Sequence, residues 1–339
     1  MLAATTIPAV FGTAAGLLAL AGIVVAAFGA ALLLPVLPAA IAWIGSAGLA
    51  NRIMHAASNR TRALLRKSFE HYLPPTVIAQ MLDADTLPKL GGERRELSVL
   101  FTDVAGFTTL SESVAPEFLA TLCNDYFDGV CEAIFEQGGM VNEFIGDAVL
   151  AFFGAPIEQP DHADRAVSAA LRVDEFASRF SAEQKSRGVD FGHTRIGVHT
   201  GIAIVGNVGT RSRLKYSALG DMLNTGSRLE GLNKTIGTRI CVSGEIVAKS
   251  KRHGFRPIGS FVVKGRHGAT DVFEPLGDQP VDRTDRYEAA FRALETGLPE
   301  ADGLFAALHR DYPEDACVTF HCQRFAAGEA GALIVMTEK

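Results

Sequence analysis

The sequence predicts an α+β domain of the ferredoxin-like type, preceded by a transmembrane helical hairpin and followed by a short helical tail. Three observations lead to this prediction. The first 51 residues contain no Asp, Glu, Lys or Arg, whereas charged residues are frequent afterwards. Residues 96–276 alternate between the two-residue period of strands and the 3.6-residue period of helices. Beyond residue 278 the apolar pattern is helical.

The N-terminal segment, 1–54, is predicted to cross the membrane. Residues 7–50 form one apolar tract that is broken by Pro35 and Pro38. A membrane-spanning helix needs about 20 residues, so the tract accommodates two spans, at 7–28 and 31–51, although a single span also fits. The alternative is a buried hairpin in a globular core, but 51 residues without a charge are rare in soluble helices.

Basic residues follow the apolar tract. Five of them precede the first acid, Glu70: Arg52, Arg60, Arg62, Arg66 and Lys67. The positive-inside rule places this end of the tract in the cytoplasm. We therefore expect an integral protein of the inner (cytoplasmic) membrane, in contact with lipid, with the domain that follows the tract in the cytoplasm.

Residues 55–91 are expected to form a helical connector. Ala63, Leu64, Phe69 and Leu73 give a ragged apolar stripe that ends at Pro74. Fewer than three clean heptads are present, so a dimerising signalling helix and a plain linker both fit the pattern.

Composition excludes some classes of function. A net charge of −6 argues against nucleic-acid binding, which requires a basic face. The five cysteines include no C-x-x-C pair and no zinc-type spacing, which is typical of reduced thiols in a cytoplasmic domain.

The domain at 92–277 is predicted to follow the order βαββαβ with later additions. Its strands are expected at 96–103, 140–145, 148–153, 194–201, 256–264 and 271–276, with helices at 115–137 and 161–186. The segment LKYSALG (214–220) is expected to lead into a further helix that ends near Asn233. Gly146-Asp147 marks a hairpin turn between two of these strands. This order is typical of a ferredoxin-like α+β sandwich.

The tail, 278–339, carries helical segments such as Tyr287–Thr296 and Asp302–Arg310. It is similar to a single tetratricopeptide-like helical pair. One such repeat cannot bury its own apolar face, so we expect the tail to pack on the catalytic domain or on a protein partner.

Two acids are the first candidates for chemistry. Asp103 ends a buried strand, and Asp147 lies in the tight hairpin turn. Two carboxylates held at the ends of neighbouring strands can share divalent ions, and Mg²⁺ prefers one or two protein carboxylates plus substrate phosphates. Either acid alone is weak evidence, because Asp is common at strand ends and turns.

Five motifs then identify a family. LFTDVAGFTTLSE, EFIGDAVLAFFGAP, RIGVHTG, YSALGDMLNTGSRLE and VKGR occur in this order between residues 100 and 266. Together they resemble the catalytic domain of class III adenylate and guanylate cyclases, over about 92–277. The resemblance implies a ferredoxin-like cyclase fold and the conversion of ATP or GTP to a 3′,5′-cyclic nucleotide plus pyrophosphate, in intracellular signalling.

The resemblance also implies a role for each matching position. Asp103 and Asp147 match the metal-binding aspartates, and Val104 matches a residue whose carbonyl is a metal ligand. Arg195 matches an arginine that contacts the phosphates. Asn224 and Arg228 keep the N-x-x-x-R spacing of the transition-state pair, which places both on one face of a helix. Lys264 matches the lysine that meets the terminal phosphates, and Arg266 lies close enough to assist or substitute for it.

The family further implies two Mg²⁺ (or Mn²⁺) ions and a homodimer with shared sites. The metal aspartates and the phosphate arginine come from one subunit, whereas the base-reading residues, the N-x-x-x-R pair and the loop lysine come from the other. Two metals activate the ribose hydroxyl and neutralise the phosphates, and arginine forks suit phosphate oxygens.

The base-reading positions depart from the adenylate pattern. Glu143 and Ser217 stand where adenylate-type members usually carry Lys and either Asp or Thr. An ionised Glu only accepts hydrogen bonds, which fits the N1–H and N2–H donors of guanine, and the Ser217 hydroxyl can donate to O6. Guanylate-type members resemble this Glu, but most bacterial-looking members use ATP, so both nucleotides stay open.

Three alternatives to an active cyclase make different demands on the sequence. A catalytically inactive cyclase-like membrane transducer would be expected to have lost one of the matching site residues, and none is lost. A cyclic-dinucleotide synthase requires a G-G-[DE]-E-F signature, which is absent. A membrane scaffold that acts through the helical tail is the third.

Overall fold

The computed structural model describes residues 92–210, 213–262, 268–277 and 281–336, together with scattered residues between Leu18 and Arg52. The chain divides into two compact units, 1–71 and 72–339. Within the described residues, no helix has both the length and the apolar character that crossing a membrane requires. The predicted spans at 7–28 and 31–51 lie mostly, and the connector at 55–91 wholly, outside the described residues.

The first half of the catalytic domain is an antiparallel sheet of four strands. They are β1 (Glu93–Val104), β2 (Met140–Ile145), β3 (Ala148–Phe153) and β4 (Thr194–Thr210). Their order in the sheet is β2-β3-β1-β4, which is the arrangement of a ferredoxin-like fold. The α+β prediction is therefore confirmed. The strand β5 (Arg213–Leu219) pairs with the far end of β4 and extends it into a two-stranded arm.

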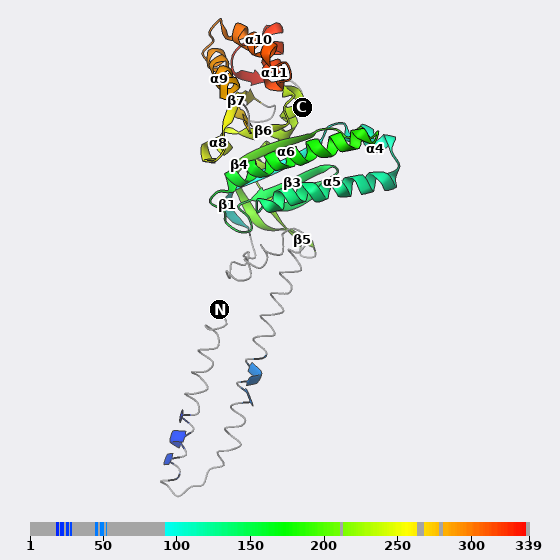
Figure 1. Ribbon diagram of the computed structural model, residues 1–339. Coiled ribbons are helices and arrows are strands. Elements are labelled where there is room, and N and C mark those ends of the chain that lie inside the picture. The colour runs from blue at the N-terminus through cyan, green and yellow to red at the C-terminus, as the bar shows by residue number, and fades with distance from the viewer. Residues whose placement is uncertain are drawn as a thin grey trace. The chain divides into compact units, whose positions relative to one another are not determined.

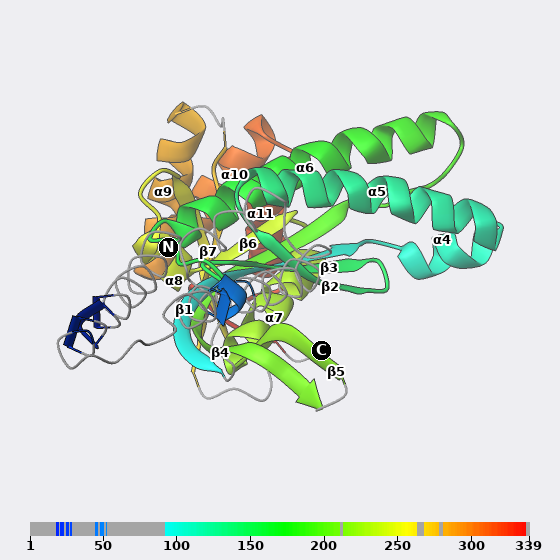
Figure 2. The same cartoon turned by 90° about the horizontal axis from the view of Figure 1, so that it is seen from below.

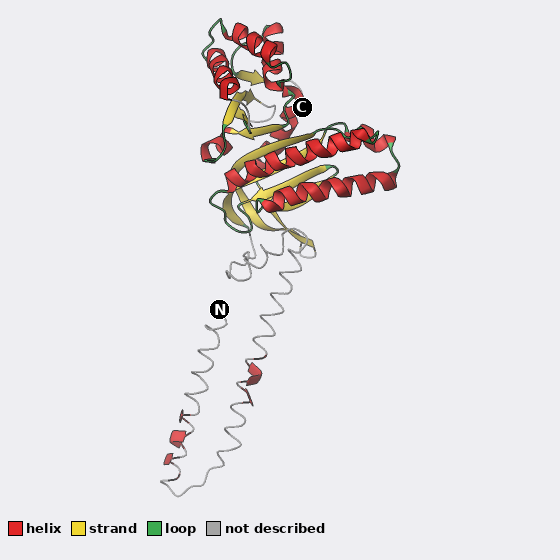
Figure 3. Ribbon diagram, in the orientation of Figure 1, coloured by secondary structure: helices red, strands yellow, loops and turns green. Residues whose placement is uncertain are grey.

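Between β1 and β4 the chain forms three helices, α4 (Phe107–Ser113), α5 (Pro116–Glu136) and α6 (His162–Ser186). The two long helices, α5 and α6, cover one face of this sheet. Proline at the first position favours the start of α5. Leu122, Tyr126, Val130 and Ile134 then recur every four residues, so they form one buried stripe against the sheet. Figure 1 and Figure 3 show α5 and α6 side by side across the strands.

The opposite face of the sheet carries α7 (Asp221–Ile236), as Figure 2 shows. Successive residues of β1 point to opposite faces. Leu100 and Val104 therefore join the core beneath α5 and α6, while Val99 and Phe101 meet α7. The contact with α7 is unusually close, because a Cβ at Gly226 would lie only 2.7 Å from Val99 Cγ2. Close packing thus explains a glycine inside this helix.

The same sheet continues into the C-terminal part of the chain. Its further strands are β6 (Ile240–Ser243), β7 (Phe255–Val262), β8 (Thr270–Pro275) and β9 (Leu333–Val335), with α8 (Gly244–Lys249) between β6 and β7. The order runs on as β4-β6-β8-β7-β9, and β9 lies parallel to the end of β7. All five cysteines are free thiols.

The tail contains α9 (Val281–Glu295), α10 (Ala301–Asp311) and α11 (Ala316–Ala326) before β9. It does not stand apart from the catalytic domain. Buried side chains of α9, α10 and α11 share one hydrophobic core with α7 and with β6, β7 and β8. Of the two placements that the sequence left open, the described residues show packing on the catalytic domain.

Candidate active site

The two predicted metal aspartates lie together at one edge of the sheet. Asp103 is the penultimate residue of β1, and Asp147 occupies the two-residue turn between β2 and β3, where Gly146 adopts φ +66°. Asp147 Oδ2 accepts a hydrogen bond from the Val104 backbone N–H at 2.9 Å. Burial raises the pKa of Asp103, and the nearby charge of Asp147 raises it further. Two carboxylates so close are stabilised by a cation between them.

This pair fits divalent metal ions of the Mg²⁺ type. Such ions take one or two protein carboxylates and leave other positions to water and phosphate. Among the described residues, no group of three or more His, Cys, Asp or Glu side chains gathers as a closed metal cage. The predicted role of the Val104 carbonyl stays a prediction, although this residue does lie at the aspartate pair.

Arg195 joins the two acids from the neighbouring strand. It is on β4, directly opposite Asp103 in the register of β1 and β4, and it forms an ion pair with that carboxylate. Its Nε lies 2.9 Å from Oε1 of Glu230. The structure therefore places the predicted phosphate-binding arginine beside the predicted metal site, with its side chain only 15% exposed.

Glu230 was missed by the sequence analysis. It lies on α7, and burial raises its pKa to about 7, with a further increase from Asp103 that Arg195 opposes. Gly226 and Glu230 are four residues apart and share the side of α7 that faces the sheet. The spacing was visible in the sequence, but an acid on a helix is normally taken to be solvated.

Asn224 and Arg228 leave α7 on the other side. Asn224 lies two residues before Gly226, and Arg228 lies two residues before Glu230. Two residues turn a helix by about 200°, so both side chains leave the side of α7 that is opposite to the sheet. Asn224 is exposed, and Arg228 is half-buried with its Nη1 buried and lacking a hydrogen-bond partner among the described residues. The predicted pair thus shares a face, and this face points away from the chain's own Asp103.

The predicted base-reading residues lie on β2 and β5. Lys215 of β5 reaches across to Glu143 of β2, with Nζ 3.1 Å from Oε1. Ser217 follows two residues later, so it shares the side of β5 that carries Lys215. The structure therefore brings the strands of Glu143 and Ser217 together and adds Lys215, a residue that no motif in the sequence marks.

Lys264 and Arg266 fall within 263–267, outside the described residues, so their roles stay predictions. They belong to the connection between β7 and β8.

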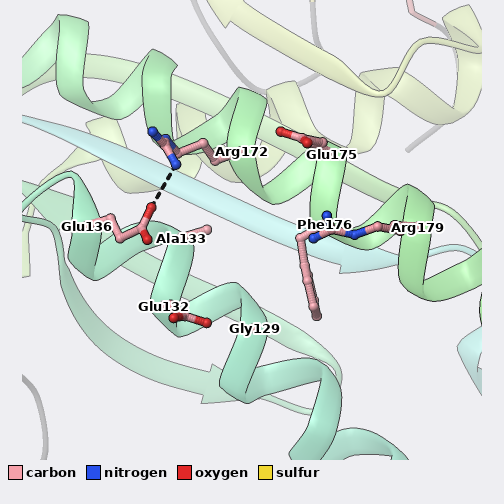
Figure 4. A pocket seen from close by; sticks show the side chains of 8 residues that line it. All are labelled: Gly129, Glu132, Ala133, Glu136, Arg172, Glu175, Phe176 and Arg179. Atoms are coloured by element: carbon pink, nitrogen blue, oxygen red, sulfur yellow. Dashed lines mark hydrogen bonds and ion pairs between the residues drawn. The ribbon is translucent and has the colours of Figure 1, made fainter.

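A surface groove between α5 and α6 is lined by none of the predicted site residues. Figure 4 shows its charged walls, where Arg172 pairs with Glu136 at 2.8 Å, near Glu132, Glu175 and Arg179. This groove lies on the layer formed by α5 and α6. The predicted site residues lie at the strand ends and on α7, so they do not line it.

Comparison with known proteins agrees with this geometry. The family model described as "Adenylate and Guanylate cyclase catalytic domain" matches residues 92–273. Adenylate cyclase 1 of Rhizobium meliloti (strain 1021) is 37% identical over 225 residues, which are 66% of this chain and 34% of that protein. An adenylate cyclase of Anabaena cylindrica is 30% identical over 217 residues, covering 61% of this chain and 42% of that protein.

Solved structures with the same fold cover the catalytic domain. The guanylyl cyclase Cya2 is 30% identical with a TM-score of 0.51, over 57% of this chain and 98% of that structure. The adenylyl cyclase CyaB from P. aeruginosa is also 30% identical, with a TM-score of 0.52, over 57% of this chain and 99% of that structure. This chain spans well under half the length of the two curated relatives that it matches.

Proposed function

This chain belongs to the adenylate and guanylate cyclase family, and we propose that it converts a purine nucleoside triphosphate, GTP or ATP, to the 3′,5′-cyclic monophosphate and pyrophosphate. One observation carries the proposal. Asp103, Asp147 and Arg195 converge at one edge of the sheet, while Asn224 and Arg228 project from α7 in the opposite direction. The first set suits a metal-bound triphosphate in the chain's own site. The second set suits a nucleotide that is bound by the metal site of another subunit.

In the proposed reaction, the ribose 3′-oxygen bonds to the α-phosphorus as the bond from that phosphorus to the bridging oxygen breaks. Asp103, Asp147 and the Val104 carbonyl would hold two Mg²⁺ or Mn²⁺ ions. When bound, such ions favour ionisation of the 3′-hydroxyl and neutralise the phosphates. Arg195 binds phosphate oxygens with its planar fork.

The remaining residues stabilise charge. Asn224 and Arg228 contact the reacting ribose and α-phosphate from the partner's α7, where charge accumulates in the transition state. Lys264, assisted by Arg266, meets the terminal phosphates. Phosphoryl-type transfer depends mainly on such positioning and electrostatic stabilisation.

A homodimer is supported by the surface as well as by the split of the site. Large apolar side chains of β2, β4 and β5 are 44–55% exposed: Phe144, Ile145, Ile202, Ile204 and Leu219. Large apolar side chains that stay exposed are candidates for a protein interaction surface. A symmetric pair of subunits that buried them would create two sites.

We propose GTP as the better substrate. Glu143 forms an ion pair with Lys215, whose Nζ lies 3.1 Å from Oε1, and a carboxylate accepts hydrogen bonds without donating any. Guanine offers this carboxylate two donors, N1–H and N2–H, and its O6 accepts from Ser217 or Lys215. Adenine offers one donor, N6–H, and one acceptor, N1, so it makes fewer bonds with the same side chains.

We also propose that residues 1–54 anchor the protein in the cytoplasmic membrane. The absence of charge before Arg52 and the basic residues after it support this, with the cyclase domain on the cytoplasmic side. Solubility of the 1–54 segment after removal of detergent would contradict it.

Mixing two inactive variants tests the proposed site. Asp103→Ala removes a metal ligand, and Arg228→Ala removes a charge that acts in the partner's site. Each homodimer should be inactive, whereas the heterodimer contains one intact site and should show about half of the wild-type rate per dimer. An inactive heterodimer of confirmed composition would contradict a shared site, and an inactive wild type would favour a membrane transducer or scaffold.

A further inference from the structure

The tail is built into the helix that carries the transition-state pair. One hydrophobic core unites Leu229, Leu232 and Ile236 of α7 with buried side chains of the tail, among them Phe305 and Val318. At the end of α7, Gly237 adopts φ +86°, and a Cβ there would lie 3.3 Å from Cβ of Ala316, the first residue of α11. The tail therefore packs directly against α7.

These contacts fix α7 from two directions. Gly226 and Glu230 face the sheet. Leu229 and Leu232 face the core that the tail shares. Arg228 lies on the side turned away from the sheet, and Leu232 follows it by one turn, so the core that the tail shares borders the side that carries Arg228. The sheet and the tail together therefore determine how α7 is rotated and where Arg228 points.

A buried ion cluster attaches the tail to the sheet. Asp315 precedes α11, and its side chain is 1% exposed. It accepts two hydrogen bonds from Arg256 of β7, at 2.6 and 2.9 Å, and two from Arg283 of α9, from Nε at 3.1 Å and from Nη2 at 2.5 Å. It also caps α11 by accepting from the Cys317 and Val318 amides. Arg256 in turn donates from Nε to Glu274 of β8 at 2.7 Å.

Such a cluster tolerates little change. A buried ion pair is well satisfied only when both partners are present, because removal of one leaves the other charge buried and unpaired. Asp315 is therefore the point at which α9, α11 and the sheet are fixed to one another.

We propose that the tail, residues 281–336, is a positioning module for catalysis: through Asp315 it fixes α7, so that Asn224 and Arg228 reach the partner's bound nucleotide in register. This inference rests on the proposed cyclase function. Asp315 is a positioning residue, because it acts through α7 and touches no substrate. The module also gives any partner that binds the tail a physical route to the active site.

The perturbation is Asp315→Asn. The amide oxygen can still cap α11, but the charge that opposes Arg256 and Arg283 is lost. A displacement of about 1 Å can cost on the order of 100-fold in rate. We expect kcat to fall between about tenfold and 100-fold, with KM and the metal dependence within about twofold, because only transition-state contacts are affected. Asp311→Asn is the matched control, since it breaks an exposed pair with Arg286 on the same tail and should leave kcat unchanged.

Heterodimers of the full chain, co-expressed with two affinity tags, assign the defect to one side of the site. With Asp103→Ala as the partner, the one intact site takes its α7 from the Asp103→Ala subunit, so the Asp315→Asn defect should disappear. With Arg228→Ala as the partner, the only competent α7 is that of the Asp315→Asn subunit, so the defect should persist. A global folding defect would lower both mixtures alike.

Several results would overturn the positioning role. They are a normal kcat for Asp315→Asn, a defect of equal size in both heterodimers, or a rise in KM without a fall in kcat. If Asp315→Asn does not yield a dimer, Ile334→Ala in β9 is the milder equivalent, because Ile334 is 6% exposed in the same core. A dimeric wild type that cyclises neither GTP nor ATP would instead contradict the proposed function, so the two failures are distinguishable.

Discussion

Replacing Glu143 by Lys and Ser217 by Asp should move the preference of the enzyme from GTP toward ATP. The two substitutions exchange a donor and an acceptor at the purine edge. Lysine would donate to adenine N1, and aspartate would accept from the N6 amine. Each single substitution should lower activity with both nucleotides, since half of the exchange pairs neither base well.

The structure sets the size of the effect and adds a third position. A lysine at 143 would face the ammonium of Lys215, which now lies 3.1 Å from the Glu143 carboxylate. At this distance two like charges in water repel by about 1 kcal/mol. Lys215→Met should therefore improve the double variant. An unpaired polar group at the base costs ~1–3 kcal/mol, so the ratio of kcat/KM values should shift roughly ten- to 100-fold.

The assay measures initial rates over a range of GTP and ATP concentrations, with Mn²⁺ and with Mg²⁺, for the wild type and for the single, double and triple variants. Changes in the ratio of kcat/KM values are independent of the active fraction of each preparation. A wild-type preference for ATP that survives all three substitutions would refute base recognition by Glu143, while leaving the cyclase assignment intact.

Three further predictions follow from individual contacts. Asp147→Asn should nearly abolish turnover while thermal unfolding is unchanged, because an amide oxygen can still accept from the Val104 N–H but cannot replace the charge; activity that persists at saturating Mg²⁺ would contradict the metal assignment. Gly226→Ala should destabilise the domain by ~1–3 kcal/mol through the clash with Val99, whereas Gly231→Ala, which has open space on the same helix, should gain up to about 1 kcal/mol in denaturant unfolding. Burial, together with Arg324 and Arg256, lowers the pKa of His321 to about 3. As the pH falls below 6.5, the unfolded chain therefore binds a proton at this histidine and the folded chain does not, so the free energy of unfolding decreases, by about 2 kcal/mol at pH 5. His321→Leu should remove this pH dependence in unfolding curves.

The long periodic elements could be predicted from the sequence, and the short ones could not. The hairpin at 140–145 and 148–153 was predicted with its observed bounds, because Gly146-Asp147 marks the turn and the runs on either side of it are short and rich in apolar residues. The strands β6 and β9 have four and three residues, which are too few to show a period. The strand β4 was predicted to end at 201, but it runs to Thr210. Its last residues are held by backbone pairing with β5 and not by packing in the core, so no apolar pattern predicts them.

The site shows the same division between local and distant information. Asp103, Asp147 and Arg195 were found because each lies in a recognisable segment, and the structure then brings them together. Glu230 and Lys215 were missed, because each matters only through a partner that is distant in the sequence, at Arg195 and at Glu143. No local pattern distinguishes these two residues from ordinary surface charges.

The most direct test of the account is identification of the product. The purified full chain, with Mn²⁺ or Mg²⁺, should convert GTP to 3′,5′-cyclic GMP and release one pyrophosphate per cyclic nucleotide, and ATP should give cyclic AMP more slowly. The Asp103→Ala variant is the control and should release neither product. Release of inorganic phosphate with a linear nucleotide product, or no turnover of either nucleotide by a dimeric wild type, would contradict the assignment as a cyclase.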